Sequence, residues 1–310
     1  MSSGIRDTRL KVRGSRYAST LSFLPCNPKE NGFTLVEMIM VIVITGIIGG
    51  MVAVFLKAPI QQYMDVARRA DMTDIADTAL RRIGRDLRLA LPNSVRVTPV
   101  GTNTYLEFLP TTGGGRYRAE FASTAPLGNI LDFTNAADNS FDVLGSPVAA
   151  NAGDFLVIYN LGISSASGCA SLGANAYEGC NRRTLVSGGT TMAFTTTALP
   201  FPFDSPSHRF QVITTPVTYV CAPAMDAAGN GTGTLMRWQG YAIQSAQPTT
   251  LPATGTPTSS VLATHVSSCN FSYDAFVVAQ RSGLVTMNLG ITESGETFTL
   301  YSATHVSNVP

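Results

Sequence analysis

Apolar residues fill positions 33–56 almost without interruption, and the one charged residue among them is Glu37. As a helix, this stretch would be about 36 Å long, enough to cross a hydrocarbon core of about 30 Å. A buried helix of a soluble protein would need a polar face, which is absent here. A secretory signal would have a shorter apolar region followed by a small-residue cleavage site. The pattern therefore predicts a transmembrane helix over residues 33–58.

Residues 60–91 show a different, amphipathic pattern. Their apolar side chains recur at steps of three and four residues, the spacing of one helix face. This stripe consists of Met72, Ile75, Ala76, Ala79, Leu80, Ile83, Leu87 and Leu91. Pro92 is expected to end the helix, and Pro59 is expected to kink or locally melt it. Residues 59–92 are therefore predicted to form an amphipathic stalk helix.

Beyond Pro92 the pattern changes to short apolar runs separated by Gly, Pro, Asn and Ser, which indicates strands. The predicted strands are Val95–Val97, Tyr105–Leu109, Phe155–Tyr159, Phe210–Ile213, Val217–Cys221, Met236–Ile243, Asn270–Val278, Leu284–Leu289 and Thr297–Tyr301. The intervening stretches 112–116, 187–191, 226–233 and 247–260 are predicted to be turns or exposed loops. The stalk stripe needs a partner, and a sheet of these strands provides one. The predicted fold is α+β, with a β-rich head over residues 93–310.

The chain has 310 residues, of which 13% are charged and 45% hydrophobic. This composition is typical of an exported, β-rich protein rather than of a cytosolic enzyme. Residues 1–32 carry six basic and two acidic residues, although the net charge of the whole chain is only +1. A basic leader ahead of an apolar run indicates the cytoplasmic flank of a membrane segment. A nucleic-acid-binding arm is the weaker interpretation.

The five cysteines are Cys26, Cys169, Cys180, Cys221 and Cys269. Four remain if Cys26 is removed with the leader. Proximity in sequence favours the pairs Cys169–Cys180 and Cys221–Cys269, while the two other pairings of four cysteines stay open. Any of these disulfides would imply an oxidising compartment.

Several residues are of types that bind nucleic acid or metals, but a structural role explains each of them better. Arg81, Arg82, Arg85 and Arg88 suggest a DNA-binding face, but Asp77 and Asp86 interrupt them, which favours a solvated or subunit-facing surface. The Asp- and Asn-rich stretch 132–142 lacks EF-hand spacing and is predicted to be an Asx-rich loop rather than a calcium site. Trp238 is predicted to lie in the core or on a strand face. His208, His265 and His305 lack metal-ligand spacing. We expect no catalytic residue, metal or cofactor.

The run Gly32-Phe33-Thr34-Leu35-Val36-Glu37, followed by an apolar helix, resembles the signature of type IV prepilins and pseudopilins. The resemblance implies that a prepilin peptidase cuts after Gly32 on the cytoplasmic side and then methylates the new N-terminus at Phe33. A glycine before the cut allows the close backbone approach that the peptidase needs. Residues 1–32 would then be the leader peptide.

The same resemblance implies a docking role for Glu37, whose carboxylate would neutralise the N-terminal amine of a neighbouring subunit. The alternative is that Glu37 reaches the headgroups and has no function. The family anchors in the bacterial inner membrane with its head in the periplasm, and its partners are the peptidase, other pilins or pseudopilins and an assembly platform.

Two shorter stretches, 78–97 and 304–310, are similar to O-type minor prepilins of the mannose-sensitive haemagglutinin (MSHA) pilus. The first also resembles J-type minor pseudopilins of type II secretion. These resemblances imply a structural subunit rather than an enzyme, with no nucleic acid bound. A membrane-anchored tip adhesin or DNA-binding module and an anchored periplasmic enzyme remain as rival classes.

Overall fold

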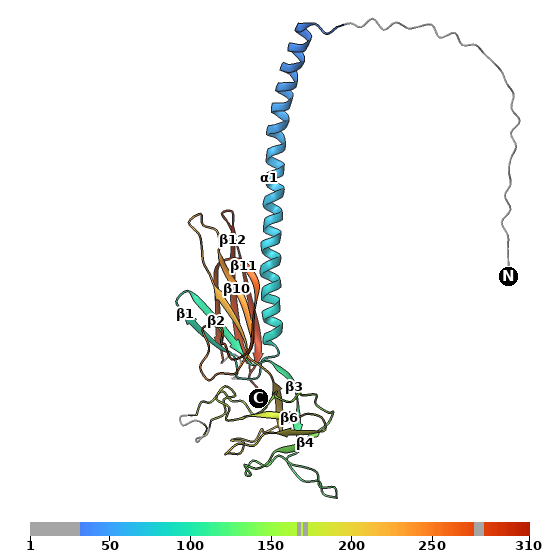
Figure 1. Cartoon of the computed structure of the whole chain (residues 1–310), viewed down its shortest axis with the longest axis vertical. Helices are drawn as coiled ribbons and strands as arrows, with labels where there is room; N and C mark the ends of the chain where they lie inside the picture. Colours follow the sequence, from blue (N-terminus) through green and yellow to red (C-terminus); the bar gives the residue numbers. More distant parts are fainter. Residues whose placement is uncertain (1–31, 166–168, 170–172, 276–281) are drawn as a thin grey trace, which may run out of the picture. The chain divides into compact units, whose positions relative to one another are not determined.

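A computed structural model of the chain describes residues 32–165, 169, 173–275 and 282–310. The chain divides into two compact units, Met1–Gln61 and Gln62–Pro310. One helix, α1 (Leu35–Leu87), begins in the first unit and ends in the second (Figure 1). It remains helical at Pro59, where the sequence predicted a kink or local melting. In the first unit every described residue of α1 is exposed.

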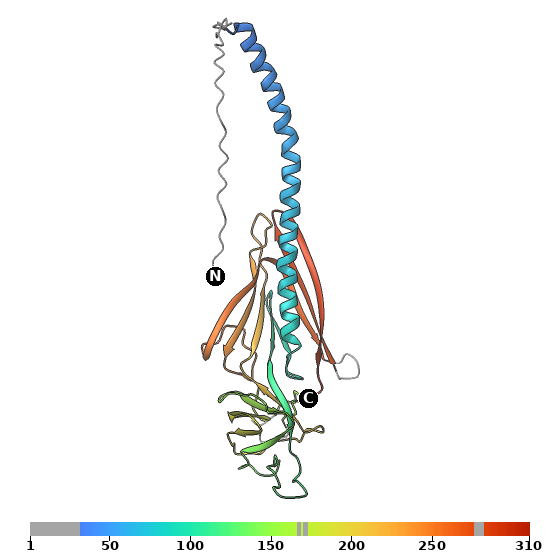
Figure 2. The same cartoon turned by 90° about the vertical axis from the view of Figure 1, so that its right-hand side faces the viewer.

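The part of α1 in the second unit buries one face against a sheet (Figure 2). The buried helix residues are Met72, Ala76, Ala79, Leu80, Ile83, Gly84 and Leu87. This is the predicted stripe, with Ile75 only partly buried at its margin. The helix ends at Leu87, before the predicted end at Leu91. Leu91 is nevertheless buried, because its backbone N–H donates to the carbonyl of Leu109 and holds the chain against the strands.

The sheet has seven strands in the order β1-β2-β9-β10-β11-β12-β13, and its paired strands are antiparallel. Their bounds are β1 (Arg96–Val100), β2 (Asn103–Phe108), β9 (Val217–Ala222), β10 (Gly233–Tyr241), β11 (Gly255–Asp274), β12 (Ser282–Glu293) and β13 (Glu296–Ser307). Apolar side chains of this sheet and the buried face of α1 form one hydrophobic core. A helix packed on an antiparallel sheet confirms the predicted α+β class.

Between β2 and β9 the chain leaves the sheet and forms a closed barrel in the order β3-β4-β7-β6-β5-β8. Its strands are β3 (Thr111–Tyr117), β4 (Ser140–Leu144), β5 (Phe155–Ile158), β6 (Arg182–Ser187), β7 (Thr191–Phe194) and β8 (Arg209–Ile213). A second core fills it, with aromatic residues such as Phe141 and Phe210 in contact. The barrel is therefore an insertion into the sheet.

Two loop predictions are wrong. Residues 112–116 lie inside β3 rather than in a turn, because β3 passes very close to β8. A Cβ atom on Gly114 would lie 2.8 Å from the carbonyl oxygen of Phe210, so glycine is needed there for packing. Residues 255–260, predicted as part of an exposed loop, open strand β11 and pair with β10. Three further barrel strands, β4, β6 and β7, were not predicted.

A buried polar cluster joins three strands of the sheet. The Glu107 carboxylate is fully buried and accepts hydrogen bonds from Arg96 Nε at 2.7 Å and from the Tyr241 hydroxyl at 2.9 Å. The Arg96 guanidinium also stacks on the ring of Tyr177, 3.6 Å from its centroid. Burial raises the pKa of Glu107, and this effect exceeds the opposing effect of Arg96. The cluster thus connects strands β1, β2 and β10 to Tyr177, which lies between β5 and β6.

Candidate functional site

The N-terminal junction is open to solvent and precedes the helix. Gly32, Phe33 and Thr34 are not helical, and α1 starts at Leu35. Phe33 is 79% exposed, and a Cβ on Gly32 would meet no atom within 4 Å. The peptide bond between Gly32 and Phe33 therefore lies in accessible, non-helical backbone, a form in which a peptidase can bind a substrate chain.

Thr34 caps the start of α1. Its hydroxyl oxygen accepts a hydrogen bond from the backbone N–H of Glu37 at 3.3 Å. The first turn of a helix has backbone N–H groups without partners, and a threonine at this position satisfies one of them. Sequence reasoning assigned Thr34 no role of its own. The spacing Thr-x-x-Glu, a capping-box pattern, was the signal that could have revealed it.

Glu37 lies in the first turn of α1 and is exposed. A negative charge near a helix N-terminus is stabilised by the unpaired N–H groups there. Around it the helix surface is apolar on every side, and the exposed side chains of the next turns include Met38, Ile39, Met40, Val41, Ile42 and Val43. Among the described residues, the carboxylate is therefore the one charged group in this apolar end of the helix.

The apolar part of α1 satisfies its own polar groups. The Thr45 hydroxyl donates to the carbonyl of Val41 at 2.6 Å, so this side chain leaves no unpaired polar atom on the helix surface. Among the described residues, α1 is the one helix that is long enough and apolar enough to cross a membrane. Its most apolar part is not buried by the rest of the chain. The structure thus fits membrane anchoring through a single helix.

The arginines of the stalk lie outside the buried face of α1. Arg81, Arg82, Arg85 and Arg88 are all exposed. Arg81 pairs with Asp77 at 2.6 Å, while Asp86 turns toward the sheet, where it accepts hydrogen bonds from Arg237 and Tyr219. Burial and this contact with Asp86 raise the pKa of Tyr219. Three of the arginines border a groove of about 560 Å³ between α1 and β13.

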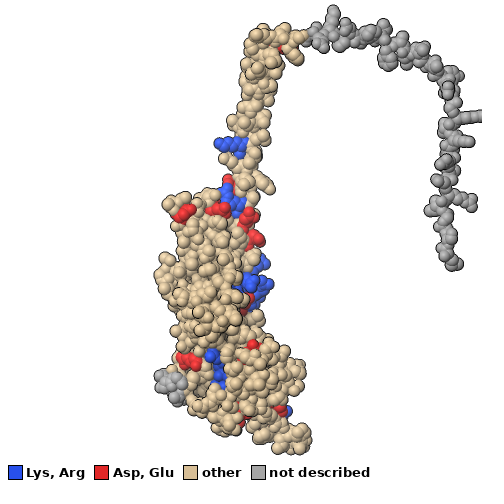
Figure 3. All heavy atoms as spheres, viewed as in Figure 1, with Lys and Arg blue, Asp and Glu red and all other residues tan. Residues whose placement is uncertain are grey.

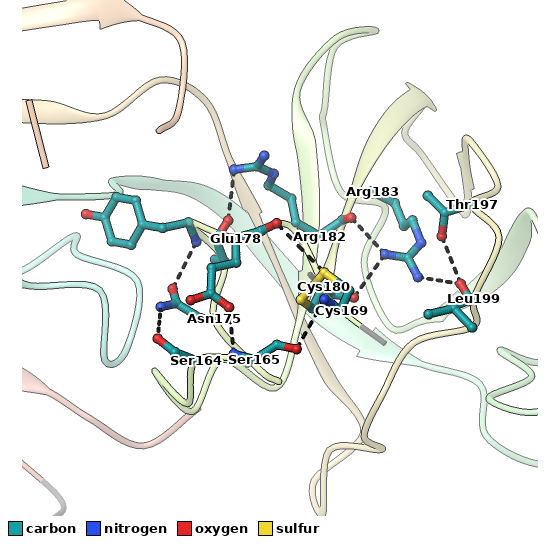
Figure 4. Close-up of a disulfide and its surroundings, with 12 residues drawn as sticks. Ser164, Ser165, Cys169, Asn175, Glu178, Cys180, Arg182, Arg183, Thr197 and Leu199 are labelled. Atoms are coloured by element: carbon teal, nitrogen blue, oxygen red, sulfur yellow. Dashed lines mark hydrogen bonds between the residues drawn. A yellow bond between two sulfur atoms is a disulfide. The ribbon is translucent and has the colours of Figure 1, made fainter. Parts of the chain in front are cut away.

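Among the described residues, the structure contains two disulfides, Cys169–Cys180 and Cys221–Cys269, the pairing that sequence proximity favours. Cys221 on β9 is buried in the core beneath α1, so its bond to Cys269 on β11 ties strands of the same sheet. Figure 4 shows the first disulfide beside Arg183, whose guanidinium donates to the carbonyls of Cys180 and Leu199. Burial lowers the pKa of Arg183 to about 10.

The 132–142 stretch and Trp238 make contacts that stabilise the fold. In the 132–142 stretch, Asp132 accepts from the backbone and hydroxyl of Thr134, and Asn135 accepts from the backbone of Ala137, as predicted for an Asx-rich loop. Trp238 is buried on β10 against Tyr105, also as predicted. Within the described ranges, no group of three or more His, Cys, Asp or Glu side chains could hold a metal.

Comparison with known families gives one match. Residues 27–53 match the family described as the prokaryotic N-terminal methylation motif. Neither the curated proteins nor the solved structures compared with the chain match it significantly. The matched range contains the Gly32–Phe33 junction, Glu37 and most of the apolar helix. It supports the resemblance to type IV prepilins and pseudopilins, and hence a pilin-like structural subunit that is processed at its N-terminus.

Proposed function

We propose that this protein is a minor subunit of a type IV pilus-like filament of the MSHA type, which it joins or initiates after prepilin processing. One observation carries the proposal: an accessible Gly32–Phe33 bond lies two residues before an exposed apolar helix with Glu37 in its first turn. Prepilin peptidase would cut this bond, release residues 1–32 and methylate Phe33. The mature chain would begin with the membrane helix.

Glu37 would be the docking charge. An ionised carboxylate in a membrane costs about 2.5–3.5 kcal/mol near the centre and less near the edge. Cleavage creates a positive amine on Phe33, and the amine of a neighbouring subunit would neutralise Glu37. An unpaired charge in a low dielectric is strongly unfavourable. Pairing across subunits therefore favours docking over a dispersed state in the lipid.

The partners and location follow from this scheme. The peptidase and an inner-membrane assembly platform would act on the helix, and other pilins would pack against its apolar surface once it leaves the lipid. The head would lie in the periplasm, where the two disulfides would be stable. The basic leader, on the opposite side, fits a cytoplasmic N-terminus.

The type II secretion J-type minor pseudopilin is the second candidate, since the stretch 78–97 resembles both groups. The resemblance of residues 304–310 favours the pilus system. These residues include the end of β13 and the Asn308 side chain, which accepts a hydrogen bond from the Tyr273 hydroxyl at 3.1 Å. The amide nitrogen of Asn93 also donates a hydrogen bond to the backbone carbonyl of Asn308, at 3.3 Å. The C-terminus thus has a structural role in either system.

The docking role is tested with three substitutions at one position in the full-length chain. Glu37→Ala and Glu37→Gln remove the charge, whereas Glu37→Asp keeps it. We expect all three variants to insert into the membrane, and only Glu37→Asp to retain substantial incorporation into filaments. Incorporation is measured by immunoblotting of sheared filaments against the membrane fraction. Equal incorporation of Glu37→Ala and the unchanged protein would refute the docking role.

A further inference from the structure

Arg183 is a buried cation at one end of the barrel. It is the second residue of β6 and is only 5% exposed. Its guanidinium lies over the ring of Phe201, with Cζ 4.4 Å from the ring centroid. Nη1 donates to the carbonyls of Cys180 and Arg182, at 3.1 and 2.9 Å, and Nη2 donates to the carbonyl of Leu199, at 2.9 Å (Figure 4). These contacts hold the guanidinium in one orientation.

Two of the hydrogen-bond donors of Arg183 have no partner among the described residues. A guanidinium has five N–H groups, one on Nε and two on each terminal nitrogen. The three bonds to carbonyls use both groups of Nη1 and one of Nη2. The remaining donors are therefore on Nε and Nη2. These are the two nitrogens through which Arg69 binds both carboxylate oxygens of Glu296.

No carboxylate neutralises Arg183 in the part of the chain that the structure describes, where it forms no salt bridge. The Glu178 carboxylate accepts from the backbone N–H of Ser165. The carboxylates of Asp132 and Asp138 accept from backbone N–H groups of their own loop. Burial lowers the pKa of Arg183 to about 10. Carbonyls satisfy the donors but leave the positive charge, which is costly in a buried site unless an anion pairs with it.

Arg183 lines a pocket of about 220 Å³. The disulfide Cys169–Cys180 forms part of its wall, and the stretch 197–200, which follows β7, forms another part. Residues 197–199 are exposed, so the pocket opens at the surface. Apart from Arg183, its wall is largely apolar, with sulfur, Ala198, Leu199 and two prolines. The pocket is smaller than the pockets of about 300–1,000 Å³ that hold drug-sized ligands, so it suits a ligand of few atoms.

We propose that this pocket binds a small aliphatic monocarboxylate. The carboxylate oxygens accept hydrogen bonds from Nε and Nη2 of Arg183, and the alkyl chain contacts the disulfide and Leu199. A monoanion neutralises the single positive charge, whereas a phosphate dianion would leave one charge unpaired in the same buried place. The inference concerns the barrel alone and does not depend on the proposed filament role.

Thermal unfolding of the full-length protein in detergent, followed by calorimetry, tests the site. Butyrate is the probe, and butyramide in sodium chloride of equal ionic strength is the control of the same shape without charge. We expect butyrate to raise the unfolding midpoint by about 3–5 °C at about ten times its dissociation constant, and butyramide to have no effect. Charged side chains are sparse on the barrel face seen in Figure 3, so few competing sites for an anion are expected there.

Three variants assign the effect to Arg183. Ala198→Phe fills the pocket from an exposed position, so it should fold in chloride and lose the response to butyrate. Arg183→Lys keeps the charge but not the paired donors, and should weaken butyrate binding about tenfold. Arg182→Lys is the matched control. Arg182 is half-buried and donates to the carbonyl of Ala176, but it does not line the pocket, so its variant should keep the full shift.

Four results would overturn the inference. The first two are no shift of the midpoint with butyrate, and a shift of equal size with butyramide. The third is an unchanged butyrate response in both Ala198→Phe and Arg183→Lys. The fourth is an equal loss of the response in Arg182→Lys and Arg183→Lys, which would mean that the anion acts on the barrel without this pocket. Because the arginine variants do not fill the pocket, they keep the test decisive even where Ala198→Phe fails to fold.

Discussion

The two halves of α1 differ in where their partners are. From Leu35 to Leu56 the helix is apolar on all sides except at Glu37, and every residue is exposed. From Met72 to Leu87 it is amphipathic, and its apolar face is buried against the sheet. The sheet of the same chain covers the apolar face of the second half. The apolar surface of the first half is left for lipid or other subunits to cover. Substitutions in the second half should therefore change folding, and those in the first half should change assembly.

The largest contrast is expected between two carboxylates. Glu107→Ala should lower the free energy of unfolding by about 3 kcal/mol, because it removes the charge partner of the half-buried Arg96 guanidinium and the acceptor of the Tyr241 hydroxyl. Glu37→Ala should leave this free energy unchanged, since Glu37 is exposed. The measurement is denaturant unfolding of the detergent-solubilised chain, followed by fluorescence of Trp238, the single tryptophan.

Glu107→Gln is the control for shape, because it keeps a hydrogen-bond acceptor for the Tyr241 hydroxyl. We expect Glu107→Gln to lower the free energy of unfolding less than Glu107→Ala does. A change for Glu107→Ala within the ordinary surface range of about ±0.5 kcal/mol would contradict the role given to this cluster.

A matched pair of isoleucines sharpens the comparison within α1. Ile83 is fully buried, whereas Ile44 is 51% exposed. Ile83→Ala should cost about 2–5 kcal/mol of unfolding free energy, from lost burial and the cavity left behind. Ile44→Ala should not change the unfolding transition of the head. Equal effects of the two substitutions in the same denaturation assay would mean that the halves do not differ as described.

The smallest effect is expected at the Arg69–Glu296 ion pair, which joins α1 to β13 with an Nη2–Oε1 distance of 2.7 Å. The hydrogen bond from Arg69 lowers the pKa of Glu296. The ion pair therefore stabilises the folded protein above the ordinary pKa of glutamate. This stabilisation is lost as the pH falls through the lowered pKa of Glu296. Because the pair is exposed, the contribution should be slight and should shrink with salt.

Glu296→Gln measures this contribution. The unfolding midpoints of the variant and the unchanged protein should differ slightly at neutral pH and low salt, and should converge on acidification. A gap that widens toward acid pH would show that the sign is wrong.

Periodicity predicted the parts of the fold that depend on one face of one element. The stripe from Met72 to Leu87 was visible because a helix packed on one side repeats every three to four residues. The helix end was misplaced because Leu91 is buried for another reason, its contact with Leu109 after the helix has ended. An apolar pattern alone does not distinguish a residue buried on a helix face from one buried just after the helix has ended.

The barrel was the least predictable part. Strand β3 contains Gly113, Gly114 and Gly115, which as a sequence indicate a turn but here allow close contact with β8. Strands β4, β6 and β7 are short, and each packs only part of its length into the core. Such requirements come from residues far away in sequence, which local patterns do not record.

The candidate site was more predictable than the head, because it is contiguous. Gly32, Phe33 and Glu37 lie within six residues, so their spacing could be read directly. The cap provided by Thr34 was legible in the same stretch. The Arg96–Glu107 pair was not, because its members lie on adjacent strands and its third member, Tyr241, comes from far along the chain.

The most direct test is the intact mass and N-terminal sequence of the protein recovered from its native membrane. The account predicts a chain that begins at N-methylated Phe33, lacks Cys26 and contains four oxidised cysteines. A chain that still carries residues 1–32 would contradict it, and an anchored module that is not processed would then be the better description.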